Sequence, residues 1–195
     1  VGAFAARVIT RRARGRSPVT TDATGDCAAT GASEQERLSG FGPVIDEGCE
    51  TIILGSFPSQ ASLAAGHYYA HPRNQFWPIL GAALGEPLGA LPFQDRYDRL
   101  LAHRIALWDV LGACERRGSL DADIRAAAAN DFVLLERLGP RLRRVLFNGR
   151  AAGRFEPGFR AHAYETHVLP STSPAHASVG FDCKLDAWRA ALDRN

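Results

Sequence analysis

Residues 51–59 read TIILGSFPS, and this stretch decides the fold class of the chain. TIILG is a short run of β-branched and apolar residues that a glycine stops, which is typical of a buried strand in a parallel sheet. GSFPS is a glycine-proline turn that can bring backbone N–H groups close to a ligand. It lacks the glycine spacing of dinucleotide and triphosphate sites, and a simple tight turn between strand and helix is an equally good interpretation.

Further apolar runs and helical patterns follow along the chain. Strands are predicted at 105–110, 144–149 and about 164–169. Helices are predicted at 74–84, 95–103, 119–129, 130–138 and 181–192, with Ser119 and Asn130 as N-caps. Strands that alternate with helices indicate an α/β protein. We therefore predict a three-layer α/β/α fold around a central four-stranded parallel sheet.

The composition divides the chain into a tail and a globular domain. Residues 1–40 carry six arginines against four acidic residues and have no helical or strand period, so we predict a disordered N-terminal tail. Residues 41–195 carry seventeen basic and seventeen acidic residues, so their overall charge gives no support for DNA binding. No apolar run approaches the roughly eighteen residues of a membrane span. The four cysteines lack the spacing of metal ligands, and we expect reduced thiols, no metal and no other cofactor.

Two loops fall where parallel α/β folds bind ligands, at the carboxyl ends of the strands. GSFPS follows the first predicted strand, and PSTSPAHAS, residues 170–178, follows the fourth. Hydroxyl and backbone N–H groups can hold phosphate oxygens without a formal charge, although an ordinary Ser/Pro loop is the alternative. The phosphate hypothesis covers Ser171, Thr172, Ser173, His176 and Ser178.

The aromatic segment YYAHPRNQFW, residues 68–77, carries the most information. Tyr68 and Tyr69 precede the predicted helix, so we expect them in a loop where a ring can stack on a flat base. Phe76 and Trp77 lie inside the helix and are predicted to be core residues. Asn74 stands near the helix start, where N-capping is the simpler interpretation. Its amide can also hold a water molecule or read a base edge, because it offers both a donor and an acceptor.

Several segments resemble, in order, the motifs of the hypoxanthine-DNA glycosylases: GSFPSQASLAAGHYYAHPRNQFW, HRIALWDVLGACERRGSLDADI, RVLFNG and LPSTSPAHAS. This family, also called the DNA-deoxyinosine glycosylases, is a branch of the uracil-DNA glycosylase superfamily. The resemblance runs from about Phe41 to Leu192, so residues 41–195 are expected to form the glycosylase domain. It implies a four-stranded parallel sheet between helices and metal-free hydrolysis of the base–sugar bond of a flipped deoxynucleotide.

One position departs from the wider superfamily. The superfamily usually has Asp or Asn directly before the proline of the first motif, where it places the hydrolytic water, but this chain has Phe57. The hypoxanthine branch shares this departure and is similar in relying on the Asn of HPRN, which implies that Asn74 is catalytic. In mismatch-specific uracil glycosylases the first aromatic residue of a similar run stacks on the base. That role falls on Tyr69.

The chemistry of such a hydrolysis leads to a hypothesis about the residues of the first loop. The backbone N–H groups of Gly55, Ser56 and Phe57 are expected to face the purine and to stabilise its developing negative charge. Ser59 and Arg73 are added to the residues expected to contact DNA.

Lys184 is the only lysine in the chain, and we expect it on the solvated face of the last helix. A lyase needs an amine that forms a Schiff base with the sugar, so we predict a monofunctional enzyme that leaves an intact abasic strand. Asp109 and Cys114 are expected near the cleft without an assigned reaction step. Asp109 is open to two interpretations, a ligand of the water or a cap.

Other functions stay open from the sequence. A uracil or mismatch glycosylase uses the same fold, and a noncatalytic module that binds lesion DNA would explain the missing acid of the first motif. The favoured function is repair of deaminated adenine by base excision, with double- or single-stranded DNA that contains deaminated bases as the partner. We expect a cytoplasmic monomer without membrane association that acts on bacterial nucleoid DNA.

Overall fold

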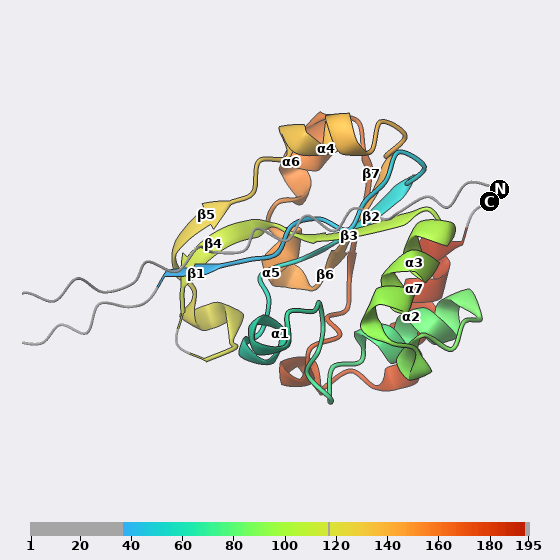
Figure 1. Cartoon of the computed structure of the whole chain (residues 1–195), viewed down its shortest axis with the longest axis horizontal. Helices are drawn as coiled ribbons and strands as arrows, with labels where there is room; N and C mark the ends of the chain where they lie inside the picture. The colour runs from blue at the N-terminus through green and yellow to red at the C-terminus, as the bar shows by residue number, and fades with distance from the viewer. Residues whose placement is uncertain (1–36, 117, 194–195) are drawn as a thin grey trace, which may run out of the picture.

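A parallel sheet of four strands, in the order β3-β2-β6-β7, organises the chain (Figure 1). The computed structural model describes residues 37–116 and 118–193. β2 (Thr51–Gly55) is buried along its whole length because β3 (Ile105–Asp109) and β6 (Arg144–Asn148) flank it in parallel. β7 (Glu165–Leu169) pairs with the outer side of β6. The predicted sheet is confirmed, with each strand within a residue of its predicted bounds.

Helices cover both faces of this sheet, which confirms the three-layer prediction (Figure 1). One face holds α2 (Phe76–Leu84), α3 (Phe93–Ala102) and α7 (Phe181–Leu192). The other face holds α4 (Val133–Leu138), α5 (Arg150–Gly153) and α6 (Glu156–Ala161). The connections contain α1 (Gln60–Ala65) and the 3-10 turns η1 (Leu88–Ala90), η2 (Asp121–Asp123) and η3 (Pro174–His176).

Aromatic packing joins α2 to α7. Phe76 and Trp188 are fully buried, and their ring centroids lie 6.0 Å apart in an edge-on arrangement. Trp188 Nε1 donates a hydrogen bond to the Pro170 carbonyl at 3.1 Å, which fixes the end of β7 against α7. Phe76 and Trp77 are core residues, as predicted.

The prediction that Lys184 is solvated is wrong. Its side chain is 1% exposed, and Nζ donates to Gln75 Oε1 at 2.8 Å and to the His176 carbonyl at 2.9 Å. The physical reason is that α7 presents Phe181, Lys184, Leu185 and Trp188 on its packed face. Lys184 therefore links three segments: α7, the start of α2 and the 170–178 loop.

A second sheet, with three antiparallel strands in the order β1-β4-β5, was not predicted. It contains β1 (Arg37–Ser39), β4 (Leu111–Glu115) and β5 (Arg125–Ala129). The predicted helix at 119–129 is therefore wrong, because this segment forms η2 and β5. Alanine favours helices by propensity, but pairing of its backbone with β4 overrides that preference.

The predicted N-caps at Ser119 and Asn130 are also wrong. Ser119 Oγ accepts from the Gln60 N–H at 3.1 Å, so it holds α1 instead of starting a helix of its own. Asn130 Nδ2 donates to the Asp109 carbonyl at 2.8 Å. The helix after it, α4, starts later, where Asp131 Oδ1 accepts from the Val133 N–H at 3.1 Å. Both side chains connect distant segments, which local sequence does not reveal.

The folded domain includes residues before the predicted boundary at residue 41. Arg37–Ser39 pair with β4, so at least these residues of the predicted tail belong to the folded unit. The predicted disordered tail otherwise consists of residues 1–36, which lie outside the described residues. Within 37–116 and 118–193 no helix combines the length and hydropathy that crossing a bilayer requires. Cys49, Cys114 and Cys183 are free thiols, and Cys27 lies outside the described residues.

Candidate active site

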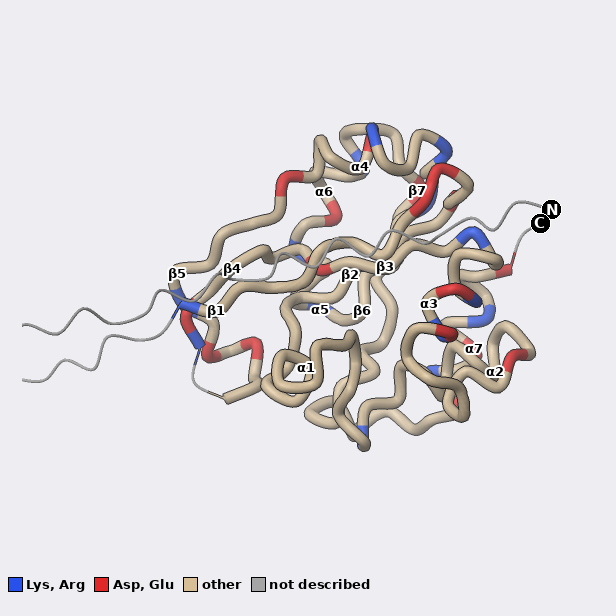
Figure 2. Tube along the Cα trace, viewed as in Figure 1, with Lys and Arg blue, Asp and Glu red and all other residues tan. Residues whose placement is uncertain are grey.

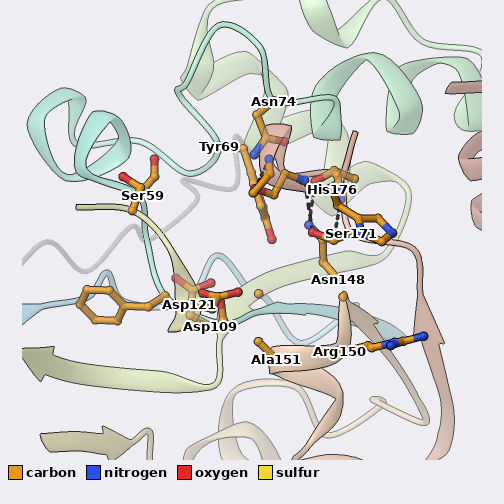
Figure 3. A pocket seen from close by; sticks show the side chains of 18 of the residues that line it. Ser59, Tyr69, Asn74, Asp109, Asp121, Asn148, Arg150, Ala151, Ser171 and His176 are labelled. Carbon is orange, nitrogen blue, oxygen red and sulfur yellow. Dashed lines mark hydrogen bonds between the residues drawn. The ribbon is translucent and has the colours of Figure 1, made fainter. Parts of the chain in front are cut away.

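A cavity of about 710 Å³ lies at the carboxyl edge of the parallel sheet (Figure 3). Its size is in the range of small-molecule sites. Segments that follow all four parallel strands line it, together with parts of the 68–74 and 119–122 loops. The two loops singled out in the sequence, 55–59 and 170–178, therefore meet at one cavity.

Gly55 keeps the floor of the cavity open. It is the direct neighbour of Asp109 in the parallel register of β2 and β3. A Cβ atom at Gly55 would lie 2.3 Å from Asp109 Oδ1 and 2.7 Å from the Tyr69 hydroxyl, so no larger residue fits without displacing them. The carbonyls of Gly55 and Ser56 accept from the N–H groups of Val110 and Leu111. This pairing fixes the backbone at the end of β2.

Of the three backbone N–H groups predicted to bind the base, those of Ser56 and Phe57 are free donors, whereas Gly55 is the last residue of β2. In the described part of the chain, the N–H groups of Ser56 and Phe57 donate to no carbonyl or side chain. Both residues line the cavity. The Phe57 ring is buried, with the Arg116 guanidinium carbon 5.2 Å from its centroid, so this ring has a packing role and cannot orient water.

Tyr69 lines the cavity with a strained backbone. Its φ of 53° lies in the left-handed region, which a residue with a side chain rarely adopts. One face of its ring stacks on Phe76, with centroids 3.8 Å apart and planes 16° from parallel. That contact leaves only the opposite face for a base. Burial and the charge of Asp109 raise the pKa of Tyr69, so its hydroxyl stays protonated at neutral pH.

Asn74 directly precedes Gln75, the N-cap residue of α2, and lines the cavity. Its Oδ1 accepts from the Phe76 N–H at 2.9 Å. Because a backbone N–H needs an acceptor, the atom facing Phe76 is the oxygen, and the amide NH₂ is left for a ligand or water. The two interpretations of Asn74 are therefore compatible, since the bond to the Phe76 N–H holds the amide at the cavity.

Asp109 is the buried carboxyl group of the site. Its side chain is 3% exposed, and Oδ2 has no hydrogen-bond partner among the described residues. Burial, and to a lesser extent the charge of Asp121, raise the pKa of Asp109 to about 8, whereas Arg116 opposes this shift. Asp121 itself accepts a hydrogen bond from Ser56 Oγ at 2.6 Å. The carboxyl group is therefore largely protonated at neutral pH.

The 170–178 loop is fixed to β6. Asn148 Oδ1 accepts from the Thr172 N–H and Asn148 Nδ2 donates to Thr172 Oγ1, both at 2.9 Å. Thr172 is fully buried, so the structure contradicts its predicted contact with phosphate, and the reason is this pair of bonds. Ser171 Oγ accepts from the Ser173 N–H at 3.2 Å, and Ser173 Oγ accepts from the Ala175 N–H at 3.3 Å.

The other predicted DNA contacts divide into two groups. Ser59, Ser171, Ser173 and His176 line the cavity, and the Ser59 hydroxyl also caps α1 by accepting from the Ser62 N–H at 3.2 Å. Arg73 and Ser178 are exposed outside the lining. Basic and acidic residues are interspersed over the molecule in Figure 2, in agreement with the neutral charge of the domain. Any contact with DNA phosphates therefore depends on local groups.

Several polar residues of the lining received no site role from the sequence, among them Asn148, Asp121 and Arg150. Figure 3 shows Asp109 and Asp121 near one another, with Asn148, Ser171 and His176 across the cavity. Asn148 is the last residue of β6 and precedes Gly149, and this Asn-Gly pair was interpreted only as a strand end. The position of Arg150 directly after this turn was the available signal for a basic group at the same edge.

Residues 43–192, which include the whole lining of the cavity, match the family model described as Uracil DNA glycosylase superfamily. The chain belongs to the uracil DNA glycosylase superfamily. Two curated relatives, both named Hypoxanthine DNA glycosylase, come from Methanosarcina species. The Methanosarcina barkeri protein is 41% identical over 81% of this chain and 99% of its own length. The Methanosarcina acetivorans protein is 45% identical over 70% of this chain and 87% of its own length.

A solved structure of the superfamily has the same fold. It is the solution NMR structure of a candidate uracil DNA glycosylase from Methanosarcina acetivorans, with a TM-score of 0.74 and 41% identity. The match covers 80% of this chain and 97% of the other. The residues outside the superfamily match include β1, and the cavity lies entirely inside it.

Proposed function

We propose that this chain is a monofunctional DNA glycosylase that hydrolyses the bond between hypoxanthine and deoxyribose in DNA, as a repair enzyme for deaminated adenine. Two relatives named Hypoxanthine DNA glycosylase support the substrate. The observation that carries the proposal is the convergence of free backbone donors, the Tyr69 ring and the Asn74 amide on one cavity.

Recognition of the base rests on the Ser56 and Phe57 N–H groups. Hypoxanthine carries a carbonyl oxygen where adenine carries an amino group. A backbone N–H that donates to this oxygen would face the amino group of adenine donor to donor, which disfavours the normal base. The open face of Tyr69 stacks on the extruded base and offsets part of its unstacking free energy, which is a few kcal/mol.

Hydrolysis depends on a water molecule held below the sugar. Asn74 is the proposed residue for this task, because its bond to the Phe76 N–H fixes the amide in place. An amide does not titrate and is a poor general base. Its contribution is orientation of the water toward a sugar with oxocarbenium character.

The surroundings of Lys184 support the proposal that the enzyme has no lyase activity. Its Nζ is bound to Gln75 and to the His176 carbonyl, and Lys184 does not line the cavity. A Schiff base would require this amine to leave both acceptors and to reach the sugar. Borohydride is therefore expected to trap no covalent complex with an inosine oligonucleotide.

The DNA strand is proposed to run along the edge that carries Ser59, Arg150, Ser171 and His176. Double- and single-stranded DNA with deaminated bases are both proposed substrates, with nucleoid DNA as the cellular source and a monomer as the acting form. Both relatives are archaeal, so they lend no support to the bacterial origin expected from the sequence.

The test is release of free hypoxanthine from a double-stranded oligonucleotide with one deoxyinosine. Asn74→Ala is expected to lower the single-turnover rate by about 100-fold or more. Asn74→Ser is the matched variant, because a serine hydroxyl can accept from the start of α2 without the amide. The assignment of Asn74 is wrong if Asn74→Ser releases base at the wild-type rate, and the function is wrong if the wild type releases none.

A uracil glycosylase is the second candidate function. The solved relative described as a candidate uracil DNA glycosylase favours it, and an N–H group that donates to the hypoxanthine carbonyl can also donate to a uracil carbonyl. Matched oligonucleotides with deoxyinosine or deoxyuridine distinguish the two. Faster release of hypoxanthine supports the first function, and faster release of uracil supports the second.

A further inference from the structure

Among the described residues, no hydrogen bond or ion pair of the Asp109 side chain explains its burial. Its carboxyl group lies at the cavity, beside Gly55 and close to the Tyr69 hydroxyl, and both of these residues line the same cavity. Oδ2 is buried without a hydrogen-bond partner among the described residues. Burial of an unpartnered carboxyl group is unfavourable, so a role toward a ligand is the physical explanation that the geometry offers.

The charged groups around Asp109 do not stabilise its ionised form. The titratable groups that face it are the hydroxyls of Tyr68 and Tyr69, the acid Asp121 and the base Arg116. No basic side chain among the described residues forms an ion pair with it, and Arg116 donates its Nη2 to the Pro58 carbonyl. The neutral acid, with one O–H donor, is the form that these surroundings favour.

We propose that Asp109 is the general acid of the proposed glycosylase reaction, and that its carboxyl O–H donates a proton to the departing purine. This inference rests on the proposed function, since it needs a base in the cavity. The same O–H can hydrogen-bond to an acceptor of the purine before the bond breaks, so the group binds the substrate and then serves the leaving group.

The bond between C1′ of the sugar and N9 of hypoxanthine breaks, and its electron pair goes to the purine. The Asp109 proton moves to a purine nitrogen, which leaves neutral hypoxanthine and an Asp109 carboxylate. The water oxygen held by Asn74 bonds to C1′ and releases a proton. Uptake of one proton from solvent water restores the Asp109 acid, and no oxidant or reductant takes part.

The other groups at the cavity are poorer acids. The pKa of Tyr69 is raised by burial, so its hydroxyl is a weaker proton donor than an ordinary phenol. Asp121 is exposed and already accepts from Ser56 Oγ. The Asn74 amide does not titrate. Among the described residues of the lining, Asp109 is therefore the one buried carboxyl group.

The experiment compares single-turnover release of hypoxanthine by the wild type and Asp109→Asn from about pH 6 to about pH 10. Asn has the shape of Asp without a titrating proton. We expect Asp109→Asn to be at least about 100-fold slower near pH 6. The ratio of the two rates is expected to fall as pH rises through about 8, because the wild type then loses its acid. Titration of the deoxyinosine base affects both enzymes and cancels in the ratio.

A second variant keeps the test valid if Asp109→Asn does not fold. Asp121→Asn removes the negative charge that opposes ionisation of Asp109, and it preserves an oxygen that accepts from Ser56. At low salt, where screening is weak, the midpoint of its pH–rate profile is expected to move to lower pH. An unchanged midpoint would contradict the acid role of Asp109.

The outcomes separate this inference from the proposed function. If the wild type releases no hypoxanthine at any pH, the proposed function fails and the acid role fails with it. If the wild type releases hypoxanthine and the ratio stays constant with pH, only the acid role is overturned. A ratio that falls through the expected range supports both.

Discussion

Two buried ionisable side chains have opposite surroundings in this molecule. Lys184 on α7 is 1% exposed, and its Nζ donates to a side-chain oxygen and a carbonyl from two other segments. Asp109 at the end of β3 is 3% exposed, and its Oδ2 has no partner among the described residues. Both positions are almost closed to solvent, but only the lysine has its hydrogen bonds satisfied.

The hydrogen-bond partners of these two side chains indicate different reasons for their burial. Lys184 lies away from the cavity and holds α2, α7 and the 170–178 loop together, so it acts on function through structure. Asp109 lines the cavity, and its Oδ2, which has no partner among the described residues, is available to hydrogen-bond to a ligand. The partners, more than the burial, indicate which of the two side chains takes part in chemistry.

The largest expected effect comes from filling the space beside Asp109. Gly55→Ala places a methyl group 2.3 Å from Asp109 Oδ1, so the carboxyl group or the strand must move. A displacement of this size at a reacting group is expected to lower the single-turnover rate by about 100-fold or more. Gly89→Ala is the control, because a Cβ there meets nothing within 4 Å. Wild-type activity of Gly55→Ala would show that the space has no role.

The second largest effect is expected at Lys184, whose hydrogen bonds are satisfied. Lys184→Met keeps most of the side-chain volume but leaves Gln75 Oε1 and the His176 carbonyl without their donor. Unsatisfied buried acceptors are expected to lower the free energy of unfolding by about 3 kcal/mol, measured by urea denaturation. Arg189→Met, at an exposed position of the same helix, is expected to change it by less than about 1 kcal/mol. Equal stabilities of the two variants would contradict the anchoring role of Lys184.

The sequence predicted the parallel sheet because its strands carry their own signal. TIILG and RVLFN are short, mainly apolar runs ended by glycine or Asn-Gly. Such runs predict strands that are buried on both faces, without information from the rest of the chain. The segment 119–129 has no such signal. Its alanines favour a helix, and only pairing with β4, which is distant information, makes part of it a strand.

The site was predictable in its loops and less so in its electrostatics. Tyr69 and Asn74 stand in one short motif, and both line the cavity. Lys184 shares the packed face of α7 with Leu185 and Trp188, so its periodicity was an available signal of burial. The protonation of Asp109 depends on burial and on Asp121 and Arg116, which local sequence around Asp109 does not specify.

The third prediction uses pH to test the state of Asp109 in the absence of DNA. Its pKa is raised from 3.8 to about 8 by folding, so between these values the folded state holds a proton that the unfolded state has lost. The free energy of unfolding is therefore expected to fall as pH rises through this window, by up to about 1.4 kcal/mol per pH unit. Urea denaturation of Asp109→Asn should lack this component. Parallel pH profiles of the two proteins would contradict a buried neutral acid.

The smallest effect is expected at Thr172 in the 170–178 loop. The test is whether its hydroxyl has a structural role or contacts DNA. Thr172→Val removes the acceptor of Asn148 Nδ2 while the bond from the Thr172 N–H to Asn148 Oδ1 remains. We expect a loss of about 1–2 kcal/mol in the free energy of unfolding. The salt dependence of DNA binding should stay unchanged, because a fully buried side chain contacts no phosphate. A weaker salt dependence in Thr172→Val would instead restore the contact expected from the sequence and place Thr172 among the groups that hold DNA.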